Sequence, residues 1–141
     1  MDNKTKVQRS LNMAAVKSKN TKPELIVRKE LFRQGFRYRL NVKKLPGTPD
    51  IVLPKYKTII FINGCFWHGH KECKKSKLPS TNTIFWENKI SDTVQRDKLK
   101  SERLESLGWF VIVCWECDIL HKHITFSVRK NHLALKYKLK E

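Results

Sequence analysis

The feature that most constrains the fold of this chain is a short loop crowded with metal ligands. Residues 64–73 have the sequence Gly-Cys-Phe-Trp-His-Gly-His-Lys-Glu-Cys, so Cys65, His70 and Cys73 offer three ligands at close spacing. A closed tetrahedral zinc site requires a fourth ligand, which Cys117, at the end of a later apolar run, can supply. The sequence therefore predicts a structural zinc site built from these four residues.

The charge balance points to a polyanionic partner. The chain has 141 residues, enough for one domain, and thirty Lys and Arg against thirteen Asp and Glu give a net charge of +17. Nucleic acid is the first candidate and a membrane surface is the rival. The sequence contains no apolar run of about 18 residues, and residues 1–10 lack a signal-peptide core. We therefore expect a soluble cytoplasmic protein.

The four cysteines favour a metal over disulfides, because clustered Cys and His in a reducing cytosol are typical of metal sites. Cys114 lies three residues before Cys117 and has the spacing of a further ligand. Strand alternation places the odd-numbered residues of 111–117 on one face and Cys114 on the other. We therefore expect Cys114 to be a buried apolar residue.

The hydrophobic pattern predicts an α/β sandwich around a mixed sheet, in the order helix, three strands, helix, strand. The first helix is expected to begin with a capping box at 21–24. The expected elements are a helix over 22–34, strands over 36–42, 50–53 and 58–62, a helix over 84–107 and a strand over 109–117. A basic arm over 1–20 precedes this domain of residues 21–120, and a basic segment over 121–141 follows it as a peripheral helix.

Three acidic residues are placed to face the interior. Asp50 opens a strand after a Gly-Thr-Pro turn, at a sheet end where a carboxylate can hold a divalent cation for phosphodiester hydrolysis. Glu24 lies on the apolar stripe of the first helix, and Asp97 follows Val94 and Ile90 on the stripe of the second. The alternatives are turn capping for Asp50, helix capping for Glu24 and a stripe-edge surface position for Asp97.

His68 is left over once the four zinc ligands are assigned. A free imidazole beside a metal-bound phosphate can activate water near neutral pH, and an inward acid such as Asp97 can orient it. In the alternative interpretation, His68 replaces His70 as the zinc ligand.

Aromatic residues in and near the loop suit a base stack. Phe66 and Trp67, between two glycines, can form a wedge that opens a weakened base pair, and Trp86 can join them. Core packing is the alternative for these residues, and we prefer it for the other aromatics of this region, Phe85, Trp109 and Trp115.

Several segments together resemble the very-short-patch repair endonucleases across about residues 9–120. They are residues 46–50, 64–68, 83–86, 96–97 and 115–117. The resemblance implies a restriction-endonuclease-like fold and a DNA mismatch endonuclease that nicks 5′ to the thymine of a T·G mismatch, the product of 5-methylcytosine deamination. It also implies a monomer on double-stranded DNA in the bacterial nucleoid, with mismatch-repair proteins as further candidate partners.

The resemblance also implies a role for each site residue. In the active site, it implies Asp50 and the backbone carbonyl of Ile62 as Mg²⁺ ligands, His68 as the catalytic base steered by Asp97, and Glu24 as a further acid. It implies that Phe66, Trp67 and Trp86 form the intercalating wedge. The Zn²⁺ ligands that it implies are Cys65, His70, Cys73 and Cys117. Asn63 stands where some members carry a histidine that contacts DNA. The spacing from Cys65 to Cys73 is one residue longer than in some members.

The strand ending at Gly64 also lacks the second acid and the lysine that the wider superfamily places there. Metal binding must then depend on Asp50, backbone oxygen and water, with His68 in place of the lysine. Two further hypotheses remain: a zinc-stabilised DNA-binding protein without catalysis, and a restriction-type endonuclease that cuts paired DNA.

Overall fold

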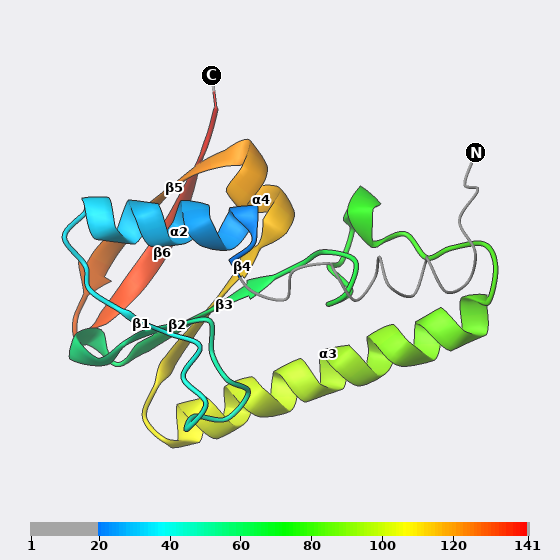
Figure 1. The fold of residues 1–141 in the computed structure, drawn as a ribbon, viewed down its shortest axis with the longest axis horizontal. Helices are drawn as coiled ribbons and strands as arrows, with labels where there is room; N and C mark the ends of the chain where they lie inside the picture. The colour runs from blue at the N-terminus through cyan, green and yellow to red at the C-terminus, as the bar shows by residue number, and fades with distance from the viewer. Residues whose placement is uncertain (1–19, 141) are drawn as a thin grey trace.

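The computed structural model describes residues 20–140, so almost all of the expected arm over residues 1–20 lies outside the described part. The elements are α2 (Lys22–Arg33), β1 (Arg39–Leu40), β2 (Ile51–Leu53), β3 (Thr58–Asn63), α3 (Thr83–Ser106), β4 (Phe110–Trp115), α4 (Glu116–His121), β5 (Lys122–Arg129) and β6 (His132–Leu139) (Figure 1). Within these residues no helix combines the length and apolarity needed to cross a membrane. The predicted order of helix, three strands, helix and strand is confirmed by α2 to β4.

The central sheet is mixed, as predicted, with strand order β1-β2-β3-β4. The pairs β1–β2 and β2–β3 are antiparallel, whereas β3 and β4 are parallel. The parallel register runs from Thr58 opposite Phe110 to Asn63 opposite Trp115. Because parallel neighbours need a crossover, the chain between β3 and β4 passes through the long helix α3.

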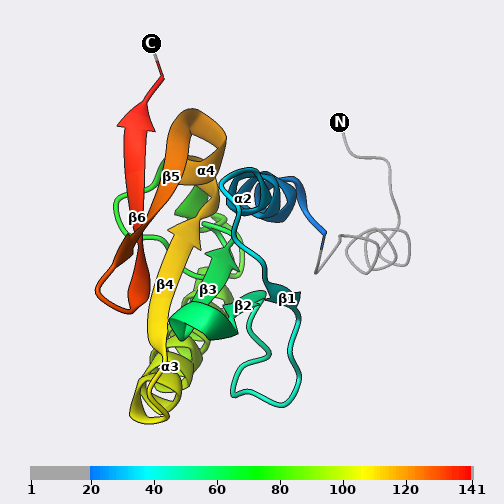
Figure 2. The ribbon, with the colours of Figure 1, turned by 90° about the vertical axis from the view of Figure 1, so that its left-hand side faces the viewer.

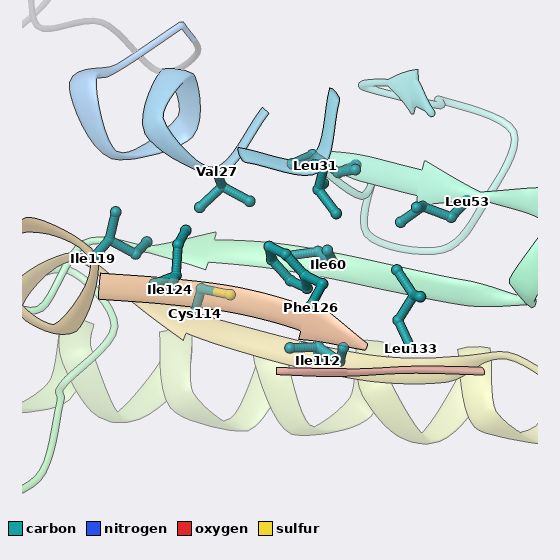
Figure 3. Close-up of a cluster of buried hydrophobic side chains, with 11 residues drawn as sticks. Val27, Leu31, Leu53, Ile60, Ile112, Cys114, Ile119, Ile124, Phe126 and Leu133 are labelled. Atoms are coloured by element: carbon teal, nitrogen blue, oxygen red, sulfur yellow. The ribbon is translucent and has the colours of Figure 1, made fainter. Parts of the chain in front are cut away.

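The two faces of the sheet carry separate hydrophobic clusters. Ile60 of β3 packs with α2, α4, β4 and the β5–β6 hairpin, and Figure 3 shows this larger cluster. Ile59 and Phe61, on the other face of the same strand, pack with Leu104 of α3. Figures 1 and 2 show α2 and α3 on opposite sides of the sheet. The prediction that residues 58–62 form a strand buried on both faces is therefore confirmed.

Helix α2 follows its predicted apolar stripe but not its predicted cap. Glu24 and Leu31 are buried on the stripe, and Gly35, with φ +91°, ends the segment. The side chain of Thr21 makes no capping hydrogen bond, and the Glu24 carboxylate accepts the N–H of Asn20 instead. The predicted capping box is therefore wrong. In a capping box Glu24 would accept the N–H of the N-cap residue Thr21, but here it accepts the N–H of the preceding residue, Asn20.

The strand predicted over 36–42 is also shorter than expected. Only Arg39–Leu40 pair with β2, and Asn41 adopts a left-handed conformation with φ +49° that breaks the extended run. Phe36 and Tyr38 still pack at the edge of the larger cluster.

The C-terminal segment is a β-hairpin, so the predicted peripheral helix is wrong. Apolar residues alternate with polar ones through β5 and β6, which meet at a two-residue turn where Lys130 has φ +53°. Phe126 and Leu133 lie in the larger cluster, and the backbone of Phe126 exchanges two hydrogen bonds with the Gln34 side chain. The N–H of Leu133 donates to Thr58 Oγ1 at 3.1 Å. The hairpin is therefore part of the domain core.

Because Leu133 is fully buried, we expect Leu133→Ala to lower the free energy of unfolding by about 2–5 kcal/mol. Leu139, on the same strand, is 73% exposed, and Leu139→Ala is the matched control with a change below about 0.5 kcal/mol. Urea unfolding of the two variants measures both values. If Leu133→Ala lowered the free energy of unfolding as little as Leu139→Ala does, the hairpin would not contribute to the core.

Candidate functional site

Asp50 lies immediately before β2, beside the C-terminal part of β3. Since Ile51 pairs with Ile60, the antiparallel register brings the Asp50 carboxylate alongside the end of β3, where its Oδ2 accepts the N–H of Ile62 at 2.7 Å. Burial, reinforced by the negative charge of Glu24, raises the pKa of Asp50 to about 6. The Ile62 N–H, the ammonium of Lys100 and the imidazole of His68 oppose that rise in the pKa of Asp50. A carboxylate in this position favours a cation nearby.

Glu24 reaches the same region from α2. Its side chain is buried, and Oε2 accepts hydrogen bonds from the Arg28 guanidinium at 2.9 Å and from the N–H of Asn20 at 2.8 Å. Its negative charge contributes to the raised pKa of Asp50, so the two predicted acids act on one another electrostatically. Arg28, which the sequence analysis did not identify, shares the burial of Glu24 and neutralises it.

His68 is held in the loop of residues 64–73 and paired with α3. His68 Nδ1 lies 2.7 Å from Asp97 Oδ2, and the two side chains are 24% and 23% exposed. With Nδ1 bound to a carboxylate, Nε2 is the ring nitrogen that can accept a proton from water. The structure thus brings together the predicted base and the acid expected to orient it.

The backbone around His68 explains this placement. The N–H groups of His68 and His70 donate to the carbonyls of Gly64 and Cys65, at 3.1 and 3.0 Å, and wind the loop into a compact turn. Gly69, with φ +61°, lies against α3 so closely that an added Cβ would be 2.7 Å from Ile90 Cγ2. Glycine is required there for both its conformation and its size. The loop therefore packs closely onto α3. Asp97 lies on the same face of α3, about one turn after Val94 and two turns after Ile90.

Lys100 is a site residue that the sequence analysis missed. Its Nζ lies 3.1 Å from Asp97 Oδ1, on the opposite side of that carboxylate from His68. A cavity of about 370 Å³ opens beside the pair and is lined by His68, Thr93, Arg96, Asp97, Leu99, Lys100 and Arg103. Asn63, the last residue of β3, is 7% exposed and lines a smaller cavity with Asp97 and Lys100. Asn63 is thus set back from the surface.

The four predicted zinc ligands come together. The ligand atoms of Cys65, His70, Cys73 and Cys117 all lie within 4.8 Å of one another. His68 is outside this group, so the alternative in which it replaces His70 is not supported. Cys114 is fully buried in the core, as predicted.

The geometry of this quartet fits a tetrahedral ion. Cys117 Sγ lies 3.4 Å from His70 Nδ1, close to the ligand separation of about 3.5 Å that Zn–S bonds of about 2.3 Å and Zn–N bonds of about 2.0 Å produce. The imidazole of His70 stacks on Trp115, with ring centroids 4.1 Å apart. Cys117 lies in the first turn of α4 rather than at the end of the predicted strand over 109–117, because β4 ends at Trp115.

The predicted wedge residues form one aromatic cluster. Ring centroids are 5.1 Å apart for Phe66 and Trp67, 5.4 Å for Phe66 and Trp86, and 6.0 Å for Trp67 and Trp86. Phe85 contacts Trp86 but is 58% exposed, so its predicted core position is wrong. Phe85 and Trp86 lie in the first turn of α3, and Figure 1 shows the N-terminal half of this helix extending beyond the sheet. Trp109 packs with the Leu104 cluster as expected.

Comparison with known proteins places the chain in a family. The family model described as DNA mismatch endonuclease Vsr matches residues 1–75. The type II nicking enzyme V.NmeAIP of Neisseria meningitidis serogroup A is 52% identical over 85% of this chain and 85% of its own length. The DNA mismatch endonuclease Vsr of Escherichia coli K12 is 42% identical over 81% of this chain and 72% of its own length. The type II nicking enzyme V.XorIIP of Xanthomonas oryzae pv. oryzae is 46% identical over 76% of this chain and 78% of its own length.

The family model covers more than half of the chain, including Asp50, His68 and three of the four cluster ligands, and these relatives are 42–52% identical over three quarters or more of the chain. The chain belongs to the DNA mismatch endonuclease Vsr family.

Proposed function

We propose that this protein is a Mg²⁺-dependent endonuclease that nicks one DNA strand 5′ to the thymine of a T·G mismatch. The observation that carries the proposal is the His68–Asp97 pair at the end of β3, beside the half-buried Asp50 carboxylate. Base, orienting acid and cation ligand thus converge where a phosphate can approach. The family membership and the net charge of +17 support DNA as the substrate.

The donor atoms near Asp50 suit a hard cation. Asp50 supplies carboxylate oxygen, and we propose the Ile62 backbone carbonyl as a second oxygen ligand, with water completing the shell. Two acids in one buried region, with the pKa of Asp50 raised to about 6, gain stability when a cation enters. When bound, Mg²⁺ supplies polarisation of the phosphate and of the attacking water.

His68 performs the proton transfer in this proposal. Nε2 accepts a proton from the water that attacks phosphorus, while Asp97 retains Nδ1–H and stabilises the imidazolium that forms. The bond from phosphorus to the 3′ oxygen breaks as the water oxygen bonds to phosphorus, and the 3′ oxygen leaves with that electron pair and takes a proton from solvent water. Arg28 pairs with the Glu24 carboxylate and holds it in place. Asn63 lines a small cavity with Asp97 and Lys100, and its amide is the DNA contact that we propose on β3.

The aromatic cluster gives the proposed mismatch preference. Phe66, Trp67 and Trp86 form a single edge-packed group, and Trp67 is 37% exposed. Inserting rings between base pairs costs unstacking energy, which is lowest at a weakened pair. The cluster therefore favours a T·G pair over a Watson–Crick pair.

We infer that α2 to β4 form a restriction-endonuclease-like core. The order of elements and the mixed sheet support this, although β3 ends without the second acid and lysine of the wider superfamily. We further propose that residues 21–120, together with the β5–β6 hairpin that completes their core, act as the endonuclease domain, as a monomer on double-stranded DNA in the bacterial cytoplasm. Mismatch-repair proteins are the further partners proposed.

A panel of duplexes with every mismatch tests the function and the wedge together. The protein with Mg²⁺ should nick T·G and leave matched duplex intact. Phe66→Ala combined with Trp67→Ala should reduce the T·G preference about tenfold or more, because stacking contributes about 1–3 kcal/mol per base. Tight binding without nicking would instead indicate a DNA-binding protein, and equal nicking of matched DNA would indicate a restriction-type enzyme.

Asp50→Asn tests the cation site with opposite effects on activity and stability. We expect nicking to fall more than about 100-fold, with DNA binding retained. A carboxyl whose folded pKa is about 6 stabilises the fold most below its ordinary pKa of 3.8, and loses this contribution as pH rises through 6. In chelator at pH 8, Asp50→Asn should therefore unfold at the same or a higher temperature than wild type.

The raised pKa of Asp50 also determines how Mg²⁺ binding depends on pH. Added Mg²⁺ should raise the Tm of the wild type more at pH 8 than at pH 5, because protons compete with the cation for Asp50 below about pH 6. The Asp50→Asn variant should show little Mg²⁺ effect at either pH. An equal Mg²⁺ shift in the variant would place the cation elsewhere.

The four-ligand cluster should hold one Zn²⁺ per chain. Cys117→Ser removes a ligand and should abolish zinc binding and destabilise the loop of residues 64–73. Cys114→Ser is the matched control, because Cys114 is buried three residues away but outside the cluster, and it should retain the metal. Metal analysis by mass spectrometry and limited proteolysis measure both effects. Wild-type protein that contains no zinc and resists chelator would contradict the assignment.

A further inference from the structure

We propose that Lys100 is a positioning residue for the reaction, which holds the Asp97 carboxylate in the orientation that directs His68. The inference rests on the proposed function, because it concerns the same site. It adds a residue that neither the sequence analysis nor the family comparison assigns.

The two oxygens of Asp97 have separate partners. Oδ2 bonds to His68 Nδ1 at 2.7 Å, and Oδ1 bonds to Lys100 Nζ at 3.1 Å. A carboxylate with one partner can rotate about its terminal torsion, since that torsion is broad. A second partner on the opposite oxygen removes this freedom and fixes the plane in which the imidazole is held. Lys100 therefore acts on His68 through Asp97.

The side chain of Lys100 is itself constrained. Its aliphatic stem runs against Gly47, where an added Cβ would lie 2.2 Å from Lys100 Cδ, and Gly47 has φ +76°. Its ammonium lies 5.2 Å from the centre of the Phe61 ring. Only 30% of the side chain is exposed. Lys100 thus lies against the turn that leads to Asp50, against strand β3 and against Asp97 of its own helix.

This arrangement distinguishes Lys100 from an ordinary surface i,i+3 pair. An exposed pair of this kind contributes little, because water screens it and both side chains remain mobile. Here the aliphatic stem of Lys100 is packed against Gly47, and the Asp97 carboxylate already forms a hydrogen bond with His68. The ammonium is also near enough to Asp50 for its charge to favour the ionised carboxylate. Lys100 therefore interacts electrostatically with both Asp97 and Asp50.

Single-turnover nicking of a T·G duplex, measured with the dissociation constant, tests the role. Lys100→Met keeps a stem of similar shape and should lower the nicking rate about 10–100-fold, the usual effect of losing a group that orients a functional side chain. The dissociation constant should change less than about threefold, because a positioning residue does not bind phosphate. Lys100→Arg should recover most of the rate, and Lys98→Met, on the exposed face of α3, should match wild type.

A double-mutant cycle tests whether Lys100 works through Asp97. In an Asp97→Asn background, Lys100→Met should reduce the rate by less than about threefold, because the carboxylate that it positions is gone. An undiminished effect there would overturn the proposal, as would loss of affinity in parallel with rate.

A measurement without DNA separates this inference from the proposed function. The Nδ1 proton of His68, identified by its loss in His68→Ala, should give a low-field NMR signal in wild type and in Lys98→Met. The signal should be lost or exchange-broadened in Lys100→Met, and its retention would overturn the inference even if the protein nicks DNA. Absence of nicking in wild type, with the signal behaving as expected, would refute only the proposed function.

Discussion

The parallel pairing of β3 and β4 is the constraint on which the rest of the structure depends. Its register places Asn63 opposite Trp115, so the two chain segments that leave these residues start side by side. One segment is the loop of residues 64–73, and the other is the first turn of α4, which carries Cys117. The four-ligand cluster can close because this register brings ligands from distant parts of the sequence to one point. A shift by one residue would turn these side chains to the opposite face.

The same strand end gathers the charged groups. Antiparallel pairing with β2 brings Asp50 to Ile62, and the crossover helix α3 brings Asp97 under the loop. Each acid in this region has a partner: Arg28 for Glu24, the Ile62 N–H for Asp50, and Lys100 with His68 for Asp97. Burial without such partners would be costly, because a desolvated carboxylate loses its hydration. The site is therefore a set of charged and hydrogen-bonded groups that offset one another.

Local chemistry made part of this architecture predictable. Ligand spacing identified the cluster, strand alternation separated Cys114 from Cys117, and acids on apolar stripes predicted Glu24 and Asp97. Contacts between distant segments were the part that local patterns could not supply. Lys100 has the spacing of a common surface pair, and its importance depends on Gly47 and Phe61 packing around it.

The errors have equally specific causes. The β5–β6 hairpin was missed because its turn contains Lys130 in place of glycine and because dense lysines obscure the alternation of Ile124, Phe126 and Leu133. Phe85 was expected in the core because phenylalanine usually is, yet α3 carries it beyond the sheet, where it has no layer to pack against. Sequence pattern reports apolar character but not whether a covering element is present.

The central claim is that the end of β3 forms one catalytic centre around Asp50 and the His68–Asp97 pair. The most direct measurement is a crystal structure of the protein bound to a T·G duplex with Ca²⁺ in place of Mg²⁺. Our account predicts the cation bound to Asp50 and to an oxygen of the scissile phosphate, with His68 Nε2 facing that phosphorus. A cation bound away from Asp50, or a scissile phosphate on another face of the protein, would contradict it.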